Sequence, residues 1–285
     1  MSHVTVIGAG LLGAGMVHRL AENGHQVTVW NRSPAKAEAL RAVASPAADP
    51  AAAVAGAAYI HLLLPEDDAV DAVLDAAAGS ISAEAWVLDH CTNLPARVAA
   101  RRARLQAAGL RYLHAPVFMG PSDTRAGTGL MLVAGPADEI AEVQAHLASL
   151  TGKLWHVGPR PDLAAIYKLC GNAVIVGMSG LMGDVLSLGE AQGLSAPDTL
   201  ALFDVFKPGG ALVPFAQRIG RAPSGPTSFA LEMAQKDVRL MIEAAQGPDG
   251  LIVLPAVAAA MQAAADLGHR ARDFAIYARP RALQG

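Results

Sequence analysis

The amino-acid sequence predicts an α/β fold in which a doubly wound parallel sheet is followed by an all-α helical domain, joined by a long interdomain helix. Two patterns predict it. Up to about residue 160, short β-branched apolar runs alternate with segments of helical apolar spacing, which is typical of a parallel sheet with crossover helices. Beyond that point the spacing is helical only. At 285 residues the chain is long enough for two domains, which we place at 1–160 and 161–285.

The first predicted strand ends in a glycine motif. A β-branched apolar run at residues 4–7 precedes Gly8, Gly10 and Gly13, so a G-x-G-x-x-G motif follows a strand and opens a helix. Gly8 allows a sharp turn, Gly10 lets the backbone approach a pyrophosphate, and Gly13 lets helix and strand pack closely. Free N–H groups at the helix N-terminus favour the anion. This context predicts a Rossmann-type dinucleotide site with contacts from Gly8, Gly10, Leu11, Leu12 and Gly13.

The second strand, residues 27–30, ends in side chains that favour NADP over NAD. An NAD site usually carries Asp or Glu about 20 residues after the glycines, where it holds the ribose hydroxyls. Here that place holds Asn31, followed by Arg32, Ser33 and, one turn on, Lys36. A guanidinium, a hydroxyl and an ammonium bind a 2′-phosphate that a carboxylate repels. We therefore predict NADP(H) as the cofactor; alternatively, Arg32 and Lys36 are ordinary solvated charges beside a helix start.

The remaining elements of the sheet domain follow in order. The sequence indicates a helix at 35–43, a Pro/Ala-rich connection at 45–55, strands at 59–64, 86–89, 111–114, 130–134 and 154–157, and a helix at 137–149 between the last two strands. In a doubly wound sheet the ligands lie beyond the carboxyl ends of the strands. The loops after the strands that end near residues 64, 89 and 114 are therefore the predicted cofactor and substrate loops.

The helical domain begins with one long helix. Predicted helices lie at 163–192, 197–206, 229–245 and 254–267, and the stretch 207–225, with its glycines and prolines, indicates a loop or a broken helix. A helix of about 25 to 30 residues spans roughly 40 Å at 1.5 Å per residue. We expect its first turns beside the cofactor and its last turns in the helical domain.

Composition limits the classes of function. A net charge of −3 gives no broad basic surface for nucleic acid, and without about 18 uninterrupted apolar residues we expect no membrane span. The chain enters a strand at once, so we expect no signal peptide. Cys91 and Cys170 lack metal-binding spacing, which predicts no metal site and reduced thiols in a cytoplasmic protein. The Ala-, Gly- and Leu-rich helical domain is expected to expose apolar surface that a partner covers, in a homodimer or homotetramer.

Two polar residues lie in the apolar first part of the long helix. Lys168 and Asn172 are four residues apart and therefore share one face. Their neighbours are apolar, and a lysine is seldom buried without a partner. Desolvation lowers the pKa of a buried ammonium toward neutrality, which makes it a useful proton donor. Lys168 is therefore a candidate proton donor, and Asn172 shares its face.

The ordered set of motifs resembles the β-hydroxyacid dehydrogenases, the family of 3-hydroxyisobutyrate dehydrogenase, tartronate semialdehyde reductase and the glyoxylate/succinic semialdehyde reductases. The resemblance runs from Gly8 to about Phe274. It rests on the glycine motif, Leu64-Pro65, Asp89-His90-Cys91-Thr92, Ala115-Pro116-Val117, Lys168-Leu169-Cys170-Gly171-Asn172, Lys236-Asp237 and Asp273-Phe274. The decarboxylating 6-phosphogluconate dehydrogenases are similar more distantly, since their helical domain is far larger than this one.

The resemblance implies further cofactor contacts. Leu64, Pro65 and Thr92 are expected to line the adenosine and nicotinamide parts of the cofactor site. Lys236 is similar to a family lysine that reaches the cofactor from the helical domain. Alternatively, Lys236 is a solvated charge paired with Asp237.

One loop departs from the family pattern. Where the family reads Ser-Gly-Gly after Pro-Val, this chain reads Phe118-Met119-Gly120, followed by a proline, which has no N–H. In the family, the serine and the glycine N–H groups grip a substrate carboxylate. We predict that Phe118, Met119, Gly120 and Thr92 contact the substrate, and two interpretations stay open. Either the loop still binds a carboxylate through Gly120, Thr92 and Arg125, or the substrate is bulkier or uncharged.

Three functions fit these observations. The first is an NADPH-dependent oxidoreductase that transfers hydride between the nicotinamide and a small carbonyl or hydroxy compound, such as a semialdehyde or a 2-oxo or 3-hydroxy acid. The resemblance implies that the catalytic residues are Lys168, as the proton donor, and Asn172, which binds the substrate or positions the lysine. The second is reduction of an imine C=N in an apolar pocket, which Phe118 and Met119 suit, although imine reductases usually carry Asp or Tyr in place of Lys168. The third is a protein that binds NADP without catalysis, which the intact Lys168 and Asn172 disfavour.

Overall fold

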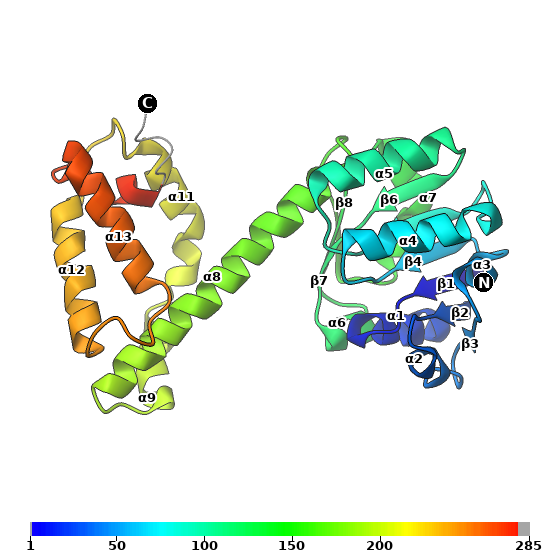
Figure 1. Ribbon diagram of the computed structural model, residues 1–285, viewed down its shortest axis with the longest axis horizontal. Helices are drawn as coiled ribbons and strands as arrows, with labels where there is room; N and C mark the ends of the chain where they lie inside the picture. The colour runs from blue at the N-terminus through cyan, green and yellow to red at the C-terminus, as the bar shows by residue number, and fades with distance from the viewer. Residues whose placement is uncertain (1, 279–285) are drawn as a thin grey trace. The chain divides into compact units, whose positions relative to one another are not determined.

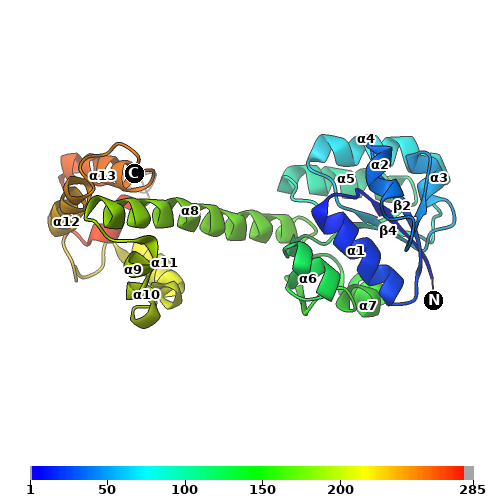
Figure 2. The ribbon, with the colours of Figure 1, turned by 90° about the horizontal axis from the view of Figure 1, so that it is seen from below.

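The computed structural model describes residues 2–278 (Figures 1 and 2). The chain divides into two compact units, Met1–Asn172 and Ala173–Gly285, and the division falls inside the helix α8 (Leu163–Ala191). The boundary that we placed at 160/161 lies before that helix. The first turns of α8 pack in the sheet unit, where Ala164 and Ala165 are buried. Because one continuous helix crosses the division, no loop in the sequence marks it.

The N-terminal unit is built on a six-stranded parallel sheet in the order β3-β2-β1-β4-β5-β6, which is the strand order of a Rossmann fold. Its strands are β1 (His3–Ile7), β2 (Gln26–Trp30), β3 (Ser45–Pro46), β4 (Tyr59–Leu62), β5 (Trp86–Asp89) and β6 (Arg111–His114). The long helix α8 and a helical unit follow along the chain. The predicted fold class is therefore confirmed.

Helices cover both faces of this sheet, with a separate apolar core under each face (Figure 2). On one face α1 and α7 pack against the sheet through residues such as Met16 and Val143, and on the other α4 and α5 pack through residues such as Leu74. Successive side chains of a strand point to opposite faces, so Val6 and Ile7 belong to different cores. The helices are α1 (Leu11–Glu22), α2 (Pro34–Glu38), α3 (Pro50–Val54), α4 (Asp67–Ala77), α5 (Pro95–Ala107), α6 (Pro121–Ala126) and α7 (Ala137–Ala148).

The last three strands form a second sheet. β7 (Val117–Phe118) pairs antiparallel with β8 (Leu130–Val133), which pairs parallel with β9 (Lys153–His156). We expected residues 130–134 and 154–157 to extend the parallel sheet, and this expectation was wrong. Only two residues separate β6 from β7. A parallel crossover needs about a dozen or more, so β7 cannot continue the parallel sheet.

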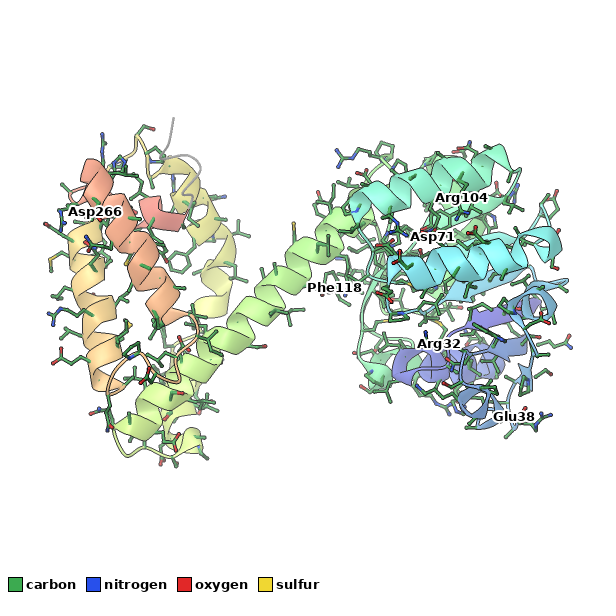
Figure 3. All side chains as sticks on the ribbon, in the orientation of Figure 1. Arg32, Glu38, Asp71, Arg104, Phe118 and Asp266 are labelled. Carbon is green, nitrogen blue, oxygen red and sulfur yellow. The ribbon has the colours of Figure 1, made fainter. Side chains whose placement is uncertain are left out.

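Charged side chains link the outer helices of the sheet unit. Figure 3 labels Asp71 of α4 and Arg104 of α5, whose charged groups lie 3.1 Å apart. The same carboxylate pairs with Arg101 at 2.8 Å and with Arg97 at 2.5 Å. Burial of the Asp71 carboxylate acts to raise its pKa, but the guanidinium groups of Arg101 and Arg97 outweigh it and lower the pKa to about 2. This cluster fixes α4 against α5, and both helices begin next to loops that face the cavity described below.

The C-terminal unit is helical in its described part. After α8 come α9 (Ala196–Leu200), α10 (Leu202–Val205), α11 (Leu212–Arg221), α12 (Leu231–Ala244) and α13 (Leu254–Ala264). The expected helix at 197–206 is divided into α9 and α10, and the stretch 207–225 is a broken helix that contains α11. Asp184 of α8 is fully buried and accepts hydrogen bonds at 2.6 to 2.8 Å from the N–H groups of Ile252, Val253 and Leu254. It thereby satisfies N–H groups that the start of α13 leaves free.

α8 is apolar along most of its length. Among residues 2–278 it is the one helix that is long and apolar enough to cross a membrane, with a mean hydropathy of 1.5 over its most apolar stretch. The same length and composition suit a helix that another protein chain covers. The length and composition of α8 therefore do not show that it crosses a membrane. The homo-oligomer and the cytoplasmic location that we expected stay predictions.

Candidate active site

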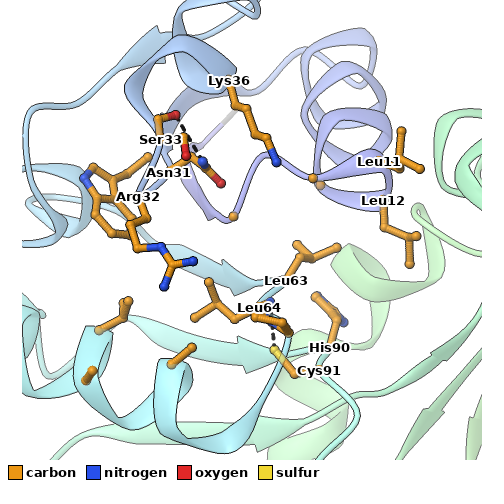
Figure 4. A pocket seen from close by; sticks show the side chains of 18 of the residues that line it. Leu11, Leu12, Asn31, Arg32, Ser33, Lys36, Leu63, Leu64, His90 and Cys91 are labelled. Atoms are coloured by element: carbon orange, nitrogen blue, oxygen red, sulfur yellow. Dashed lines mark hydrogen bonds between the residues drawn. The ribbon is translucent and has the colours of Figure 1, made fainter.

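A cavity of about 580 Å³ opens at the carboxyl ends of β1, β2, β4 and β5 (Figure 4). The chain winds in opposite directions from β1 and β4, and a doubly wound sheet binds its ligand at such a point. Every residue that we predicted for cofactor binding in this unit lines the cavity, namely Gly8, Gly10, Leu11, Leu12, Gly13, Asn31, Arg32, Ser33, Lys36, Leu64, Pro65 and Thr92. Their contacts with a cofactor stay a prediction.

The glycine turn leaves room for an anion. Gly8 has a φ of +106°, and a Cβ on Gly8 would overlap the carbonyl oxygen of Leu63. A Cβ on Gly13 would overlap the carbonyl oxygen of Gly8, whereas a Cβ on Gly10 would meet no atom within 4 Å. Gly8 and Gly13 are thus required by the fold, and Gly10 borders open space. α1 begins there without a side-chain cap or an acidic residue in its first turn, so its free N–H groups are available to a pyrophosphate.

Asn31 braces the glycine turn from the neighbouring strand. Its amide oxygen accepts a hydrogen bond from the Ala9 N–H at 3.0 Å, and its NH₂ group donates to the Ser33 carbonyl oxygen at 3.1 Å. The polar atoms of this side chain are therefore used within the protein. The ribose end of a dinucleotide is left to Arg32, Ser33 and Lys36.

Two cations stand at the rim of the cavity without an acidic partner in the described part of the chain. Arg32 and Lys36 are exposed, line the cavity and extend toward it (Figure 4). The nearest carboxylate in the sequence, Glu38, pairs with Arg41 at 2.7 Å instead. An unpaired guanidinium and an unpaired ammonium together favour a phosphate group, since neither has to give up a protein carboxylate to bind it.

The loop after β5 is held by Asp89, whose side chain is fully buried. Its carboxylate accepts hydrogen bonds at 2.7 to 3.0 Å from the Cys91 N–H, the Asn93 amide and the Tyr112 hydroxyl. Arg101 lies 3.4 Å from the same carboxylate and balances its charge. Buried polar groups satisfied in this way fix the backbone around them. The network therefore holds Thr92 at the wall of the cavity.

Cys91 joins two loops of the cavity. Its thiol accepts a hydrogen bond from the Leu64 N–H at 3.1 Å, as Figure 4 shows. Burial raises the pKa of the Cys91 thiol, with Asp89 acting in the same direction, so the sulfur stays neutral. A neutral buried thiol is a poor nucleophile, and we assign Cys91 a structural role.

Three buried histidines form a hydrogen-bonded chain that begins at the cavity wall. His90 Nδ1–H donates to the Ala115 carbonyl oxygen at 2.7 Å, so the Nε2 of neutral His90 accepts from His61 Nδ1–H at 2.9 Å. His61 Nε2 then accepts from His146 Nε2–H at 2.9 Å. Burial is the main cause that lowers the pKa of His90 to about 4 and that of His146 to about 3. A proton added to His90 or His61 would set two N–H groups against each other, and burial disfavours a charge on His146 as well.

Lys168 does not line this cavity; it lies in the first part of α8. Its Nζ donates to the Val117 carbonyl oxygen at 2.6 Å and lies 4.1 Å from the centre of the Phe118 ring. Lys168 is 9% exposed, and burial lowers the pKa of its ammonium. Of the three N–H donors, the protein uses one. Lys168 can therefore hold and protonate a second acceptor, and Asn172 lies one turn further along α8, half-buried.

Two of the three residues in the predicted substrate loop contact other parts of the protein. Phe118 faces Lys168, but Met119 packs against the core that contains α1 and α7 and lies close to Gly129. The Gly120 N–H donates to Asp123 at 2.8 Å. Of the three residues that we predicted in this loop, Phe118 alone is placed against the candidate proton donor.

Lys236 lies in the helical unit, on α12. Its ammonium pairs with Asp237 at 3.1 Å, and both side chains are exposed. The pairing that we gave as the alternative for Lys236 is therefore present. Its contact with a cofactor stays a prediction.

Sequence reasoning left out seven residues that line the cavity, namely Trp30, Leu63, Ala69, Ala72, Val73, His90 and Cys91. Two signals could have found most of them. Trp30, Leu63, His90 and Cys91 directly adjoin residues that we predicted. Ala69, Ala72 and Val73 are spaced as one face of a helix that begins just after a cofactor loop.

Comparison with known proteins gives a family and a fold. The family described as the NAD binding domain of 6-phosphogluconate dehydrogenase matches residues 3–158. The 3-hydroxyisobutyrate dehydrogenase of Pseudomonas aeruginosa is 28% identical over 96% of this chain and 96% of its own. The 3-sulfolactaldehyde reductase of Escherichia coli is 30% identical over 68% of this chain and 66% of its own length, slightly under two thirds. A solved imine reductase from Myxococcus stipitatus in complex with NADP+ shares the fold, with a TM-score of 0.86 and 23% identity over 97% of this chain and 99% of that one.

Proposed function

This chain belongs to the family of the NAD-binding domain of 6-phosphogluconate dehydrogenase, and from that premise we propose an NADPH-dependent reductase with Lys168 as proton donor. Its family and relatives make it an NAD(P)-dependent oxidoreductase related to the β-hydroxyacid dehydrogenases. The finer proposal is that it reduces the carbonyl group of a small aldehyde or ketone, or oxidises the corresponding alcohol.

The observation that carries this proposal is the environment of Lys168. Bound NADPH supplies the hydride, and the reaction then needs a proton at the carbonyl oxygen. The Val117 carbonyl oxygen holds the Lys168 Nζ at 2.6 Å, and the buried ammonium has a lowered pKa. A proton donor within hydrogen-bond reach and with a pKa nearer to neutrality is an effective general acid. In the oxidation direction the same amine accepts the proton. We assign Asn172, one turn away, to orienting the substrate.

The preference for NADPH over NADH is part of the same proposal. Arg32 and Lys36 stand at the rim of the cavity without a carboxylate partner among residues 2–278, and no acidic residue follows β2 where an NAD site usually has one. Ser33 adds a hydroxyl between them. These groups together suit a 2′-phosphate.

A second candidate function is reduction of an imine. The apolar ring of Phe118 beside Lys168 is the observation that favours it. Lys168 argues against it, because a lysine in this place is suited to protonating a carbonyl oxygen. If the purified protein with NADPH reduces 1-pyrroline but no aldehyde or ketone, imine reduction becomes the better-supported function.

The test is NADPH oxidation, measured at 340 nm with a panel of small aldehydes and ketones, for the wild type and Lys168→Met. Methionine keeps an apolar stem but has no proton to give, so kcat is expected to fall by about 10²- to 10⁴-fold, while the Kd for NADPH changes by less than about twofold. Lys153→Met, which removes an exposed lysine on β9, is the matched control and should retain the wild-type rate. An unchanged rate in Lys168→Met would reject Lys168 as the proton donor.

A further inference from the structure

Phe118 occupies a space that Gly171 leaves open. The Phe118 ring lies on the first part of α8, and a Cβ added to Gly171 would overlap its Cζ and lie 2.7 Å from its Cε1. The same ring lies 4.1 Å from the Lys168 Nζ. Phe118 also packs against a small buried cluster that includes Leu132 and Ala164. The ring is therefore held in place on both sides and forms the wall next to the candidate proton donor.

Two of the groups that could bind a carboxylate through this loop already have protein partners. The Gly120 N–H donates to Asp123 at 2.8 Å. The guanidinium of Arg125 pairs with Glu22 at 2.6 Å. Pro121 has no N–H to offer. Two of the three groups through which this loop could have held a carboxylate, Gly120 and Arg125, thus have protein partners, and the third, Thr92, lines the cofactor cavity.

The donor that contacts the ring is Lys168, and the amide of Asn172 lies one turn further along α8. A carboxylate that reached its ammonium would compete with the reacting carbonyl oxygen for the same N–H groups. It would also lie near the Val117 carbonyl oxygen and the face of the Phe118 ring, both of which carry partial negative charge. A buried ion pair is favourable only when further hydrogen bonds satisfy the remaining lone pairs of the carboxylate. An uncharged substrate needs only one hydrogen bond, from Lys168 to its carbonyl oxygen.

We propose that Phe118, in the space left by Gly171, is the specificity-determining residue and selects aldehydes and ketones that carry an uncharged group, rather than a carboxylate, near the carbonyl. This inference rests on the proposed reduction with Lys168 as proton donor. Phe118 disfavours an acid group because its apolar ring adds no hydrogen-bond donor to the wall beside the Lys168 ammonium.

The test compares a matched pair of substrates, 4-oxobutanoate and its methyl ester, which differ in charge but share the reacting aldehyde. We expect kcat/KM of the wild-type protein with NADPH to be at least about tenfold higher for the ester. Phe118→Ser opens the wall and adds a hydroxyl, so the ester-to-acid ratio should fall by at least about tenfold. A ratio is measured because damage to folding lowers both rates together and leaves the ratio unchanged.

Gly171→Ala provides a second variant that acts on the same contact. In the wild-type background its Cβ displaces the Phe118 ring, so kcat/KM for the ester should fall. In the Phe118→Ser background the added methyl group meets no ring, and the same substitution should change the rate much less. Equal effects of Gly171→Ala in the two backgrounds would overturn the assignment of this pair.

The outcomes separate this inference from the function on which it rests. If the wild type prefers the acid, or if Phe118→Ser leaves the ratio unchanged, Phe118 does not select the substrate, although the reductase function stands. If neither compound nor any other carbonyl oxidises NADPH, the proposed function fails and the inference fails with it. Where Phe118→Ser is too unstable to purify, the ester-to-acid ratio of the wild type still decides, because a preference for the acid overturns the inference.

Discussion

The cavity beyond β1 and β4 and the wall beside Lys168 offer different kinds of groups to the ligands that we propose for them. In the cavity the backbone does most of the recognition, through a glycine turn and the free N–H groups of α1, and charged side chains stand only at the rim. At the wall one buried ammonium stands among a carbonyl oxygen and an aromatic ring, while neighbouring donors are already bound within the protein. The cofactor end therefore depends on backbone shape, and the acceptor end depends on which side-chain donors remain free.

The largest effect is expected from Gly13→Ala, compared with Gly10→Ala. A Cβ at position 13 would overlap the Gly8 carbonyl oxygen, so we expect the free energy of unfolding to fall by about 3 kcal/mol or more, the upper end of overpacking costs. At Gly10 the backbone is extended and a Cβ meets no atom within 4 Å. Gly10→Ala should therefore change stability by less than about 0.5 kcal/mol yet raise the Kd for NADPH by about tenfold or more. Urea unfolding and a fluorescence titration measure the two quantities.

This pair separates a residue required by the fold from one required by the ligand. If Gly10→Ala binds NADPH as tightly as the wild type, the open space beside Gly10 does not receive the pyrophosphate. If Gly13→Ala is as stable as the wild type, the close packing of β1 and α1 is not what requires glycine there.

A smaller effect is expected at the rim of the cavity. Arg32→Ala should raise the Kd for NADPH by about tenfold to a hundredfold, because a hydrogen bond to a charged group contributes about 1.5–3 kcal/mol. The Kd for NADH, which lacks the 2′-phosphate, should change little. Arg41→Ala is the matched control, since Arg41 is exposed nearby but paired with Glu38. Equal loss of affinity for both cofactors in Arg32→Ala would contradict a 2′-phosphate contact.

The histidine chain is expected to make the stability of the sheet unit depend on pH. His90 and His146 have a pKa of about 4 and about 3 in the folded protein, against 6.5 when unperturbed. Below pH 6.5 the unfolded chain therefore binds more protons than the folded chain. The stabilisation is fully present above pH 6.5 and is lost as the pH falls toward 4 and 3, at up to about 1.4 kcal/mol per pH unit for each group.

The free energy of unfolding in urea, measured in steps from about pH 7.5 to about pH 5, tests this pH dependence. His146→Phe removes one titrating ring and keeps an aromatic ring against Tyr59, on which His146 is stacked at 3.9 Å. This variant should be less stable than the wild type above pH 6.5, since His61 loses its donor, but it should show a shallower fall with acid. An identical slope in the two proteins would show that His146 does not cause the acid sensitivity.

The contrast between the two regions also explains what the sequence could predict. The glycine motif, β1, α1 and the rim cations were predictable because the required residues are contiguous and each spacing has a geometric reason. The second sheet was not predictable from the apolar pattern. The short connection between β6 and β7 determines that β7 leaves the parallel sheet. The contacts that the side chains of the substrate loop make with the rest of the protein were not predictable either. Arg125 is bound by Glu22 of α1, which is distant in sequence, and Met119 turns into the core although its neighbour Phe118 faces Lys168.

The measurement that tests the central claim most directly is the pH dependence of kcat/KM for carbonyl reduction, in the wild type and in Lys168→Met. A general acid must be protonated, so the wild-type rate should fall as the pH rises through the pKa of Lys168, which burial places below that of an ordinary lysine. The low residual rate of Lys168→Met should show no such fall. The same alkaline fall in both proteins would contradict the account, because the proton would then come from another group.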